Sequence, residues 1–458
     1  MNAKKVLSVG QKVTLLILFA VIILGLYFGL RTTVITILSV LTLFYSISIA
    51  FTIYIMTKAL FDPQEIQLNN RDLASIHDSF WPRYTILCPL YQEANILPDF
   101  VENMTRLDYP KDRLQCLILL ECDDQETIKV AERLNLPPYF QIIFVPNYGP
   151  KTKPKACNFG LKEATGDYIV IYDAEDRPDL NQLKMAALAF NYSRREVACI
   201  QAKLNFYNPR QNILTRLFTA EYTLWFDLIL PGLQAANAPI PLGGTSNHFR
   251  TKLLKEIGGW DSYNVTEDCD LGVRLSKLKF KTAIIDSITW EEANSKLVNW
   301  LRQRSRWIKG YLQTFFVHTR NPLSLVGDMG IRNSFIVFLV TGFLPLASLI
   351  NPVLWLVTIC YFVFRPTLGP VIEQFFPAYL LYPSVLCLLV GNFVFLYSYM
   401  IAAAKKKFHG FTRYGYLSAF SWILISFAGW YAVIQLIFKP HYWEKTKHGL
   451  IKQEADHV

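Results

Sequence analysis

Residues 168–176, with the sequence YIVIYDAED, place a run of apolar and aromatic residues directly before three carboxylates. Such a run is typical of a buried β-strand. Three similar runs precede it at residues 84–91, 116–121 and 141–145, and helix-like stretches at residues 96–107, 126–134 and 155–164 separate the four. Strands that alternate with helices predict a right-handed parallel sheet covered on both faces. We therefore expect an α/β domain.

Long apolar blocks lie on both sides of this domain. The chain has 458 residues, of which 52% are hydrophobic and 18% charged, and its net charge is +10. This composition is too apolar for a disordered chain or one that coats nucleic acid, so no nucleic-acid partner is expected. Uncharged runs occupy residues 13–30, 32–56, 333–364, 377–404 and 416–438. Eighteen helical residues span about 27 Å, which is close to the thickness of a bilayer core.

These runs divide the chain into three parts. Because a second spanning run follows the first after a single arginine, residues 1–56 are expected to form an uncleaved transmembrane hairpin and not a signal peptide. Residues 57–330 contain no spanning run and are expected to form the soluble domain. Residues 331–458 are expected to form a C-terminal transmembrane region with a short basic tail.

The lysines and cysteines predict where the soluble domain lies. Lys4, Lys5 and Lys12 precede the first run and Lys58 follows the second, so the positive-inside rule places the N-terminus and the soluble domain in the cytoplasm. The eight cysteines are scattered without a CxxC pair, which favours buried, reduced thiols. We expect a multi-pass protein of the plasma (inner) membrane with a cytoplasmic catalytic domain.

The topology of the C-terminal region stays open at this point. Basic residues flank the last apolar run on both sides, at Lys405–Lys407 and from Lys439 onward, and both groups would prefer the cytoplasm. If residues 333–364 form a hairpin broken near Asn351 and Pro352, the tail is cytoplasmic and the lysine triplet is outside. If they cross once, the triplet is inside, and the last run is re-entrant or leaves the tail outside.

Carboxylates follow two of the strand-like runs, and ligands of open parallel sheets sit at the carboxyl ends of the strands. Asp123 and Asp124 follow residues 116–121, and Asp173, Glu175 and Asp176 follow residues 168–172. Carboxylates grouped this closely repel one another unless they are solvated or neutralised by a cation such as Mg²⁺ or Mn²⁺. The alternative is a solvated turn, since residues 176–179, DRPD, also suit a turn.

Two motifs near predicted helix starts offer groups for a nucleotide. Tyr91, Gln92 and Glu93 present an aromatic face and hydrogen-bonding groups that suit a nucleobase, although Glu93 also suits a helix N-terminus. Lysines at positions 151, 153 and 155 could receive phosphates beside the free amides of a helix start. The alternative for the lysines is a solvated basic loop.

Three later segments could bring further groups to the same site. The paired glycines of residues 242–250, LGGTSNHFR, permit a close backbone approach to a ligand or an ordinary tight turn. Thr266 suits a helix N-cap with Glu267 and Asp268 in the first turn, which helix capping alone could explain. Residues 299–316 predict an amphipathic helix at the membrane surface, whose arginines and tryptophans could also clamp a diphosphate and hold a sugar face.

Taken in order, these motifs resemble those of membrane-bound family 2 glycosyltransferases, the inverting enzymes that include cellulose, chitin and hyaluronan synthases. The matching stretches are PLYQEAN, CDD, KPKACNFGL, YDAED, GGTSNHFR, TED and QRSRW, at residues 89–95, 122–124, 153–161, 172–176, 243–250, 266–268 and 303–307. The resemblance covers residues 80 to 315 and is weak in the C-terminal third. It implies a GT-A domain, the Rossmann-like fold of nucleotide-diphospho-sugar transferases.

The resemblance also implies a role for each matching residue. Asp173 and Glu175 would match the metal-binding DxD motif and hold Mg²⁺ or Mn²⁺, with Glu in place of the second Asp and Asp176 as a competing ligand. Asp268 would be the general base, and Glu267 would lie beside the acceptor. The donor would contact Tyr91, Glu93, Asp123, Asp124, Lys155 and Asp173. The diphosphate and acceptor sugar would contact Gln303, Arg306 and Trp307 of the QxxRW motif.

Inversion by direct displacement needs one base and a means of stabilising the leaving diphosphate, and no covalent nucleophile. The favoured function is a processive synthase that transfers sugar from a UDP-sugar to a growing β-linked polysaccharide, either as a homo-oligomer or with separate export subunits. One alternative is a non-processive transferase that glycosylates a membrane lipid such as diacylglycerol or polyprenyl phosphate. Another is a catalytically silent protein that binds a nucleotide sugar. A transporter is disfavoured because the apolar runs contain no acid.

Overall fold

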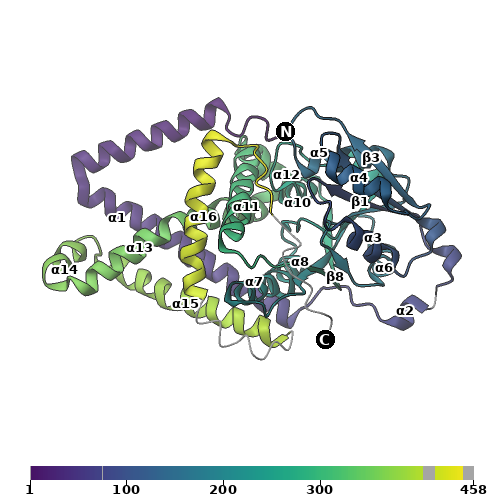
Figure 1. Cartoon of the computed structure of the whole chain (residues 1–458). Helices are drawn as coiled ribbons and strands as arrows, with labels where there is room; N and C mark the ends of the chain where they lie inside the picture. The colour runs from purple at the N-terminus through teal and green to yellow at the C-terminus, as the bar shows by residue number, and fades with distance from the viewer. Residues whose placement is uncertain (1, 75, 406–417, 447–458) are drawn as a thin grey trace.

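The computed structural model describes residues 2–74, 76–405 and 418–446. Figure 1 shows an α/β domain on one side and a group of long helices that extends away from it. The sheet has eight strands in the order β3-β2-β1-β4-β7-β6-β8-β5.

The four predicted strands form one half of the sheet. They are β1 (Tyr84–Leu90), β2 (Leu114–Glu121), β3 (Phe140–Val145) and β4 (Tyr168–Ile171). Their pairings with one another are all parallel, as predicted. The predicted intervening helices are present as α3 (Leu97–Thr105), α4 (Gln125–Arg133) and α5 (Lys153–Glu163).

The other half of the sheet is mixed, so the prediction of a wholly parallel sheet is wrong beyond β4. The short strand β7 (Asn247–Arg250) runs antiparallel to both β4 and β6 (Val197–Phe206). Strand β8 (Lys281–Glu291) is parallel to β6, and β5 (Arg177–Pro178) is an antiparallel edge. The sequence NHFR of β7 lacks the apolar run by which β1 to β4 were predicted, because Phe249 is its single apolar residue.

Both faces of the sheet are covered, as predicted. On one face, Ile86 and Cys88 of β1 join a cluster that includes Phe100 of α3 and side chains of α6 (Gln182–Tyr192). On the other face, Leu87 joins a second cluster with α5 and two further helices, α8 (Leu230–Ala235) and α10 (Glu267–Lys277). The alternation along β1 follows from the two-residue period of a strand.

The remaining elements connect and flank the sheet. Within the α/β domain and its linker they are α2 (Asn70–Ala74), the 3₁₀ turns η1 (Asp78–Phe80) and η2 (Lys111–Arg113), α7 (Ile213–Leu224), the π-helical turn η3 (Trp225–Ile229) and α9 (Thr251–Glu256). After the sheet come α11 (Leu297–His318), α12 (Pro322–Val337), the π-helical turn η4 (Phe338–Phe343), α13 (Leu344–Val363), α14 (Arg365–Glu373), α15 (Ala378–Lys405) and α16 (Ser418–Phe438).

The first helix, α1 (Val9–Phe61), folds back on itself. Its backbone leaves helical geometry at Gly29. Figure 1 shows that the helix reverses direction at the end of the molecule away from the α/β domain, so that it has two arms. A Cβ placed on Gly25 would lie 2.7 Å from Oγ1 of Thr33, so the arms approach closely at the turn. This geometry is that of the hairpin expected for residues 1–56, except that the second arm continues to Phe61.

The N-terminus lies against the α/β domain. The backbone N–H of Ala3 donates to Asp261 at 2.5 Å, and the Gln11 side chain donates to the carbonyl of Phe316 at 2.8 Å. The far end of α1 leads directly into the same domain, because a backbone hydrogen bond joins Ile66 to Ile284 of β8. Both ends of the α1 hairpin are therefore on the side of the α/β domain.

Four helices among the described residues are long and apolar enough to cross a membrane: Val9–Phe61, Pro322–Val363, Ala378–Lys405 and Ser421–Phe438. The second runs through Asn351 and Pro352 without a break, so of the two alternatives the structure has the unbroken helix and not the hairpin. In an apolar environment a broken helix would leave backbone groups without partners, which favours continuity through a proline. The helical geometry is instead interrupted at Gly330, whose φ of 80° suits glycine.

The last helix, α16, does not run alongside the others. Figure 1 shows it crossing the direction of α13, and it packs along α11 of the α/β domain and on α13. Before it, Lys405 donates to the carbonyl of Asp227 at 3.0 Å, and after it, the carbonyl of Tyr442 accepts from Lys309 at 2.8 Å. Both flanks of α16 thus touch the α/β domain, as in the re-entrant alternative. Lys406, Lys407 and the tail beyond residue 446 lie outside the described residues.

Candidate active site

One cavity of about 1770 Å³ connects the carboxyl ends of the sheet strands to the long helices. Several predicted site residues line it together, although they come from distant parts of the sequence. They are Tyr91, Glu93, Asp173, Glu175, Glu267, Asp268, Gln303, Arg306 and Trp307. The predicted gathering of ligand-binding groups at the strand ends is therefore present.

Carboxylates concentrate where β4 ends. Asp173 and Glu175 face the cavity, and Glu291, at the end of β8, joins them. Burial and then the charges of neighbouring carboxylates raise the pKa of Glu175 and of Glu291 well above the usual range. A group of acids that resists ionisation is stabilised by a cation, and its oxygen donors suit Mg²⁺ or Mn²⁺.

Asp176, the competing ligand, lies behind this cluster. It is fully buried, and one of its oxygens accepts from the backbone N–H of Asp173 at 2.8 Å and from the hydroxyl of Thr245. It therefore holds the loop that carries Asp173. Among the described residues, no group of three or more His, Cys, Asp or Glu side chains is arranged to hold a metal ion by itself.

The lysine that reaches this cluster is Lys153 and not Lys155. Lys153 Nζ lies 2.5 Å from Oδ1 of Asp173 and donates to the carbonyl of Gly244 at 2.7 Å. Lys155 is buried and pairs with Glu121 at 2.8 Å, on the inner side of α5. Two residues of an α-helix lie about 200° apart around its axis, so only one of the two lysines can face the site. The predicted donor contact of Lys155 does not fit this position.

The first acidic pair also lies outside the cavity lining. Asp123 is partly exposed and forms an ion pair with Lys151, whose hydrogen bond lowers the pKa of Asp123. Asp124 is buried as the N-cap of α4, accepting from the N–H of Thr127 at 3.3 Å and from that of Gln92. Asp124 thus fixes the turn that carries Tyr91 and Glu93. Its own carboxylate is occupied by backbone donors.

Glu267 and Asp268 begin α10, after Thr266 as the predicted N-cap residue. Burial, followed by the nearby charge of Asp268, raises the pKa of Glu267 to about 8. Burial also raises the pKa of Asp268 to about 6, while the backbone N–H of Cys269, which donates to it at 2.7 Å, opposes the rise. Burial thus raises the pKa of both acids, and that of Glu267 lies above that of Asp268. Helix capping alone would not place both acids in the cavity.

Gly310 of α11 lets this helix pack directly on the start of α10. A Cβ on Gly310 would lie 2.3 Å from Oγ1 of Thr266 and 2.7 Å from its Cβ. Replacing Gly310 with Ala is therefore expected to force the helices apart and to lower the free energy of unfolding by about 1–3 kcal/mol. Thermal unfolding of the purified protein measures this.

The matched control for this substitution is Gly327→Ala. A Cβ on Gly327, in helix α12, would meet nothing within 4 Å. Because alanine is the better helix former by about 0.5–1 kcal/mol, this variant is expected to keep or raise the unfolding temperature. If both variants unfolded at the temperature of the unchanged protein, Gly310 would not be a packing requirement.

Helix α11 forms the opposite wall of the cavity. Burial lowers the pKa of Arg306, and the nearby charges of Glu267, Asp268 and Asp173 oppose this lowering. Gln303 accepts from Asn294 at 2.9 Å. Helix α11 was predicted to lie at the membrane surface. Its Arg304 and Lys309 are buried, because α16 packs along this helix and Glu221 and Phe218 of α7 contact Arg304.

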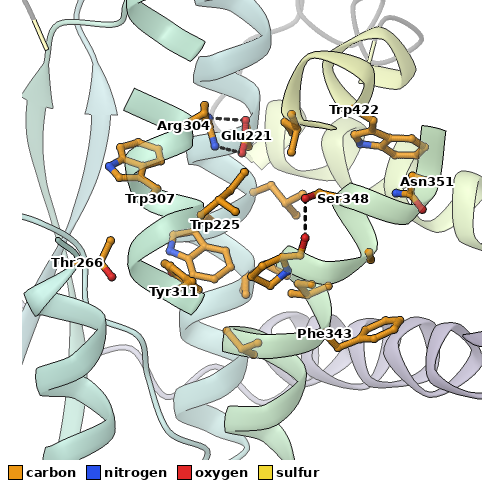
Figure 2. A pocket seen from close by; sticks show the side chains of 18 of the residues that line it. Glu221, Trp225, Thr266, Arg304, Trp307, Tyr311, Phe343, Ser348, Asn351 and Trp422 are labelled. Atoms are coloured by element: carbon orange, nitrogen blue, oxygen red, sulfur yellow. Dashed lines mark hydrogen bonds and ion pairs between the residues drawn. The ribbon is translucent and has the colours of Figure 1, made fainter. Parts of the chain in front are cut away.

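Arg304 anchors an aromatic wall that Figure 2 shows next to the pocket. It forms two hydrogen bonds with Glu221 of α7, of 2.5 and 2.6 Å, and its guanidinium lies 4.8 Å from the ring centre of Trp307. Trp307, Trp225 and Tyr311 project along the same side of the pocket in this view. Aromatic faces of this kind pack against the C–H faces of sugars.

A segment after α16 also reaches the site, which the sequence motifs did not predict. Lys445 Nζ lies 3.3 Å from Glu93 and 5.6 Å from the ring centre of Tyr91, and Trp443 lies over the guanidinium of Arg306 at 4.5 Å. The segment contacts residues that are more than 130 positions away, so no local pattern marks it. Glu291 was also missed, although the rule that selects acids at strand ends applies to it.

Comparisons with known proteins agree with this geometry. Residues 168–433, more than half of the chain, match the model of the glycosyl transferase family group 2. The chain belongs to this family. The predicted resemblance and the α/β domain of GT-A type that it implies are confirmed, as are long apolar helices beside that domain.

Individual relatives are distant. The chain is 27% identical over 237 residues to the probable glycosyltransferase YdaM of Bacillus subtilis, covering 50% of this chain and 55% of that protein. It is 28% identical over 249 residues to the UDP-forming cellulose synthase 1 catalytic subunit of Komagataeibacter xylinus, covering 53% of this chain and 32% of that protein. The chain thus spans about half or less of these relatives. A solved mannosyltransferase of Pyrobaculum calidifontis, in complex with GDP-Man and Mn²⁺, aligns with a TM-score of 0.47 and 19% identity over 78% of this chain and 99% of that one.

Proposed function

We propose that this chain is an inverting glycosyltransferase that transfers a sugar from a UDP-sugar to the growing end of a β-linked glycan. The observation that carries this proposal is that Asp173, Glu175, Asp268 and Trp307 line one cavity. A base, an oxygen-rich cation site and an aromatic wall are the groups that such a transfer needs. The name of the UDP-forming relative supports a UDP-sugar as the donor.

The donor set fits a hard divalent cation. Asp173 and Glu175 supply oxygens, and burial followed by the charges of Asp173 and Glu93 raises the pKa of Glu175. When bound, Mg²⁺ or Mn²⁺ would stabilise the negative charge that develops on the leaving diphosphate. Asp173 and Glu175 would hold it, together with diphosphate oxygens. Lys153 and Arg306 add positive charge to the same region.

Asp268 performs the chemical step in this proposal. The acceptor hydroxyl attacks the anomeric carbon of the donor, its proton passes to the carboxylate of Asp268, and the bond from that carbon to the diphosphate oxygen breaks. The nucleoside diphosphate leaves with the electron pair. Attack on the face opposite to the leaving group inverts the anomeric configuration, so a UDP-α-sugar gives a β-linkage.

The acceptor sugar would rest on Trp307, with Trp225 and Tyr311 continuing the same surface (Figure 2). A second candidate function is transfer to a membrane lipid, and a specific observation favours it. The cavity does not stop at the α/β domain but continues between the long helices.

We infer that the α/β domain lies in the cytoplasm against the plasma (inner) membrane, with the arms of α1, the helix containing α13, and α15 as the crossings. The contact of the N-terminus with the domain supports this arrangement, because Lys4, Lys5 and Lys12 then lie on the same side. The contacts at both flanks of α16 support a helix that returns to the side it came from.

The test uses full-length protein in nanodiscs with labelled UDP-sugars and Mg²⁺ or Mn²⁺. Release of UDP together with label in a larger product supports the proposal. If no donor were consumed although UDP bound tightly, the protein would be a nucleotide-sugar binder and not an enzyme. Label in a water-soluble or insoluble glycan favours the first candidate, and label that partitions into chloroform favours the second.

A further inference from the structure

The cavity extends from the acid cluster into the group of long helices. Beyond the aromatic wall, its lining passes to the second arm of α1, to η4 and α13, and to α15. Figure 2 shows Phe343, Ser348, Asn351 and Trp422 on the side of the pocket away from Trp307. One continuous space thus joins Asp268 to helices that are apolar enough to lie in lipid.

The chemical character of the lining changes along this space. The α/β end is lined by eight carboxylates and five Lys or Arg side chains, whereas the helical part has only Arg365 and Glu373, close to α14, among its described lining residues. Between these ends the lining is mainly Leu, Ile, Val, Phe and Trp. Leu381, Val385 and Leu388 face it from one stripe of α15, because residues three and four apart share a helix face.

Polar side chains in the helical part are largely engaged with protein. Thr358 donates to the carbonyl of Leu354 at 2.8 Å, and Ser348 to that of Pro345 at 2.6 Å. Other such bonds join Thr52 to the carbonyl of Ser48, Ser398 to that of Val394, Thr42 to Ser384, and Tyr45 to Asn351. A glycan in this space would leave many hydroxyls without partners, at a cost of about 1–3 kcal/mol each, whereas a hydrocarbon chain would lose nothing.

The charges around Asp268 limit the head group of the occupant. The acids at this end outnumber the bases, and Glu221 already neutralises Arg304. Arg306 and Lys153 face Asp268, Glu267 and Asp173 and are needed for the donor diphosphate. An acceptor that brought its own phosphate would add negative charge to this site. An uncharged hydroxyl suits it, and such a hydroxyl needs a base to remove its proton.

We infer that the acceptor is a lipid with an uncharged hydroxyl or sugar head, such as a diacylglycerol or its glycoside, whose acyl chains occupy the cavity between α1, α13 and α15. This inference rests on the proposed sugar transfer and selects the second of its two candidate acceptors, the membrane lipid. The head hydroxyl loses its proton to Asp268 and forms the bond to the anomeric carbon, and UDP leaves. The product is a β-glycosylated lipid, and a glycan that grows on it stays attached to the lipid.

The experiment narrows the helical part of the cavity without touching the α/β domain. Val385→Trp and Leu388→Trp place an indole in the space, and Leu386→Trp is the matched control, because Leu386 is 62% exposed and does not line the cavity. Each full-length variant is assayed in phosphatidylcholine nanodiscs that contain 1,2-dioleoylglycerol, with labelled UDP-sugars. Transfer into the chloroform phase is compared with hydrolysis of the UDP-sugar by water, and thermal unfolding confirms that each variant folds.

Val385→Trp and Leu388→Trp are expected to reduce transfer to dioleoylglycerol on the order of tenfold, with donor hydrolysis unchanged, and Leu386→Trp to match the unchanged protein. The inference is overturned if dioleoylglycerol stays unlabelled while a soluble β-linked glucose oligomer is extended, or if all three variants behave alike.

A second measurement distinguishes failure of the proposed sugar transfer from failure of the proposed lipid site. A diacylglycerol with a photoreactive acyl chain should crosslink to α13 or α15, and Val385→Trp should weaken this crosslinking. If crosslinking occurred and no UDP-sugar were consumed, the proposed transfer would fail although the lipid site exists. If donors were consumed and no crosslink formed, the lipid site alone would be refuted.

Discussion

Replacing Asp268 with Asn is expected to lower the rate of sugar transfer by roughly 10²–10⁴-fold, the usual contribution of a general base. The asparagine keeps the size of the side chain and can still accept the hydrogen bond from the N–H of Cys269, but it cannot take up the acceptor proton. Binding of UDP and of the metal should change little, because Asp173 and Glu175 are intact. Initial rates of UDP release and isothermal titration with UDP measure the two effects.

The pH profile gives a second readout for the same residue. Because the pKa of Asp268 is raised to about 6 by burial, the base is protonated below that pH, and the rate should fall about tenfold for each further pH unit. This acid limb should be absent from the residual activity of the Asn variant. A profile that kept the same limb in the variant would assign it to another group and would contradict the role of Asp268.

The stability of the Asn variant shows whether a loss of activity comes from lost catalysis or from unfolding. An acid whose pKa is raised in the folded state binds its proton more tightly when folded, so its contribution to stability is largest at low pH and is lost as the pH rises from about 4 to about 6. At pH 7 the ionised Asp268 therefore opposes folding. The Asn variant is expected to unfold at the same temperature as the unchanged protein or at a higher one, as is common for residues kept for activity.

The half of the sheet built from β1 to β4 could be predicted because its strands are continuous apolar runs between helices. The same patterns placed Asp173 at a strand end and Asp268 at a helix start, which is why both were found. Strand β7 could not be predicted, because its four residues carry no apolar run and its antiparallel place depends on pairing with strands that are distant in sequence.

Other features of the site depend on information that local patterns do not contain. The choice between Lys153 and Lys155 is set by the rotational position of α5 against the sheet, which a row of alternating lysines does not reveal. Likewise, apolar composition alone did not reveal that α16 packs along α11. Lys445 meets Glu93 only because that helix returns the chain to the α/β domain.

The second large effect is expected from Asp173→Asn. This substitution removes one of the two carboxylates proposed to hold the metal and also the partner of Lys153 at 2.5 Å. Loss of a catalytic metal costs several kcal/mol of transition-state stabilisation, and each 1.36 kcal/mol is tenfold in rate, so transfer should fall on the order of 10³-fold. Titration of Mn²⁺ in the presence of UDP, followed by the electron paramagnetic resonance signal of free Mn²⁺, should show weakened metal binding by the same variant.

The control for Asp173 is Asp108→Asn. Asp108 also pairs with a lysine, Lys184 at 2.7 Å, but it is exposed and lies outside the cavity, so its loss should leave both transfer and Mn²⁺ binding within about twofold, as is usual for a surface ion pair. If Asp173→Asn lowered transfer but bound Mn²⁺ and UDP as the unchanged protein does, Asp173 would act by positioning Lys153 beside the diphosphate. A Lys153→Met variant would then reproduce the loss of transfer seen with Asp173→Asn. If Asp173 is a metal ligand, Lys153→Met should instead retain Mn²⁺ binding that Asp173→Asn weakens.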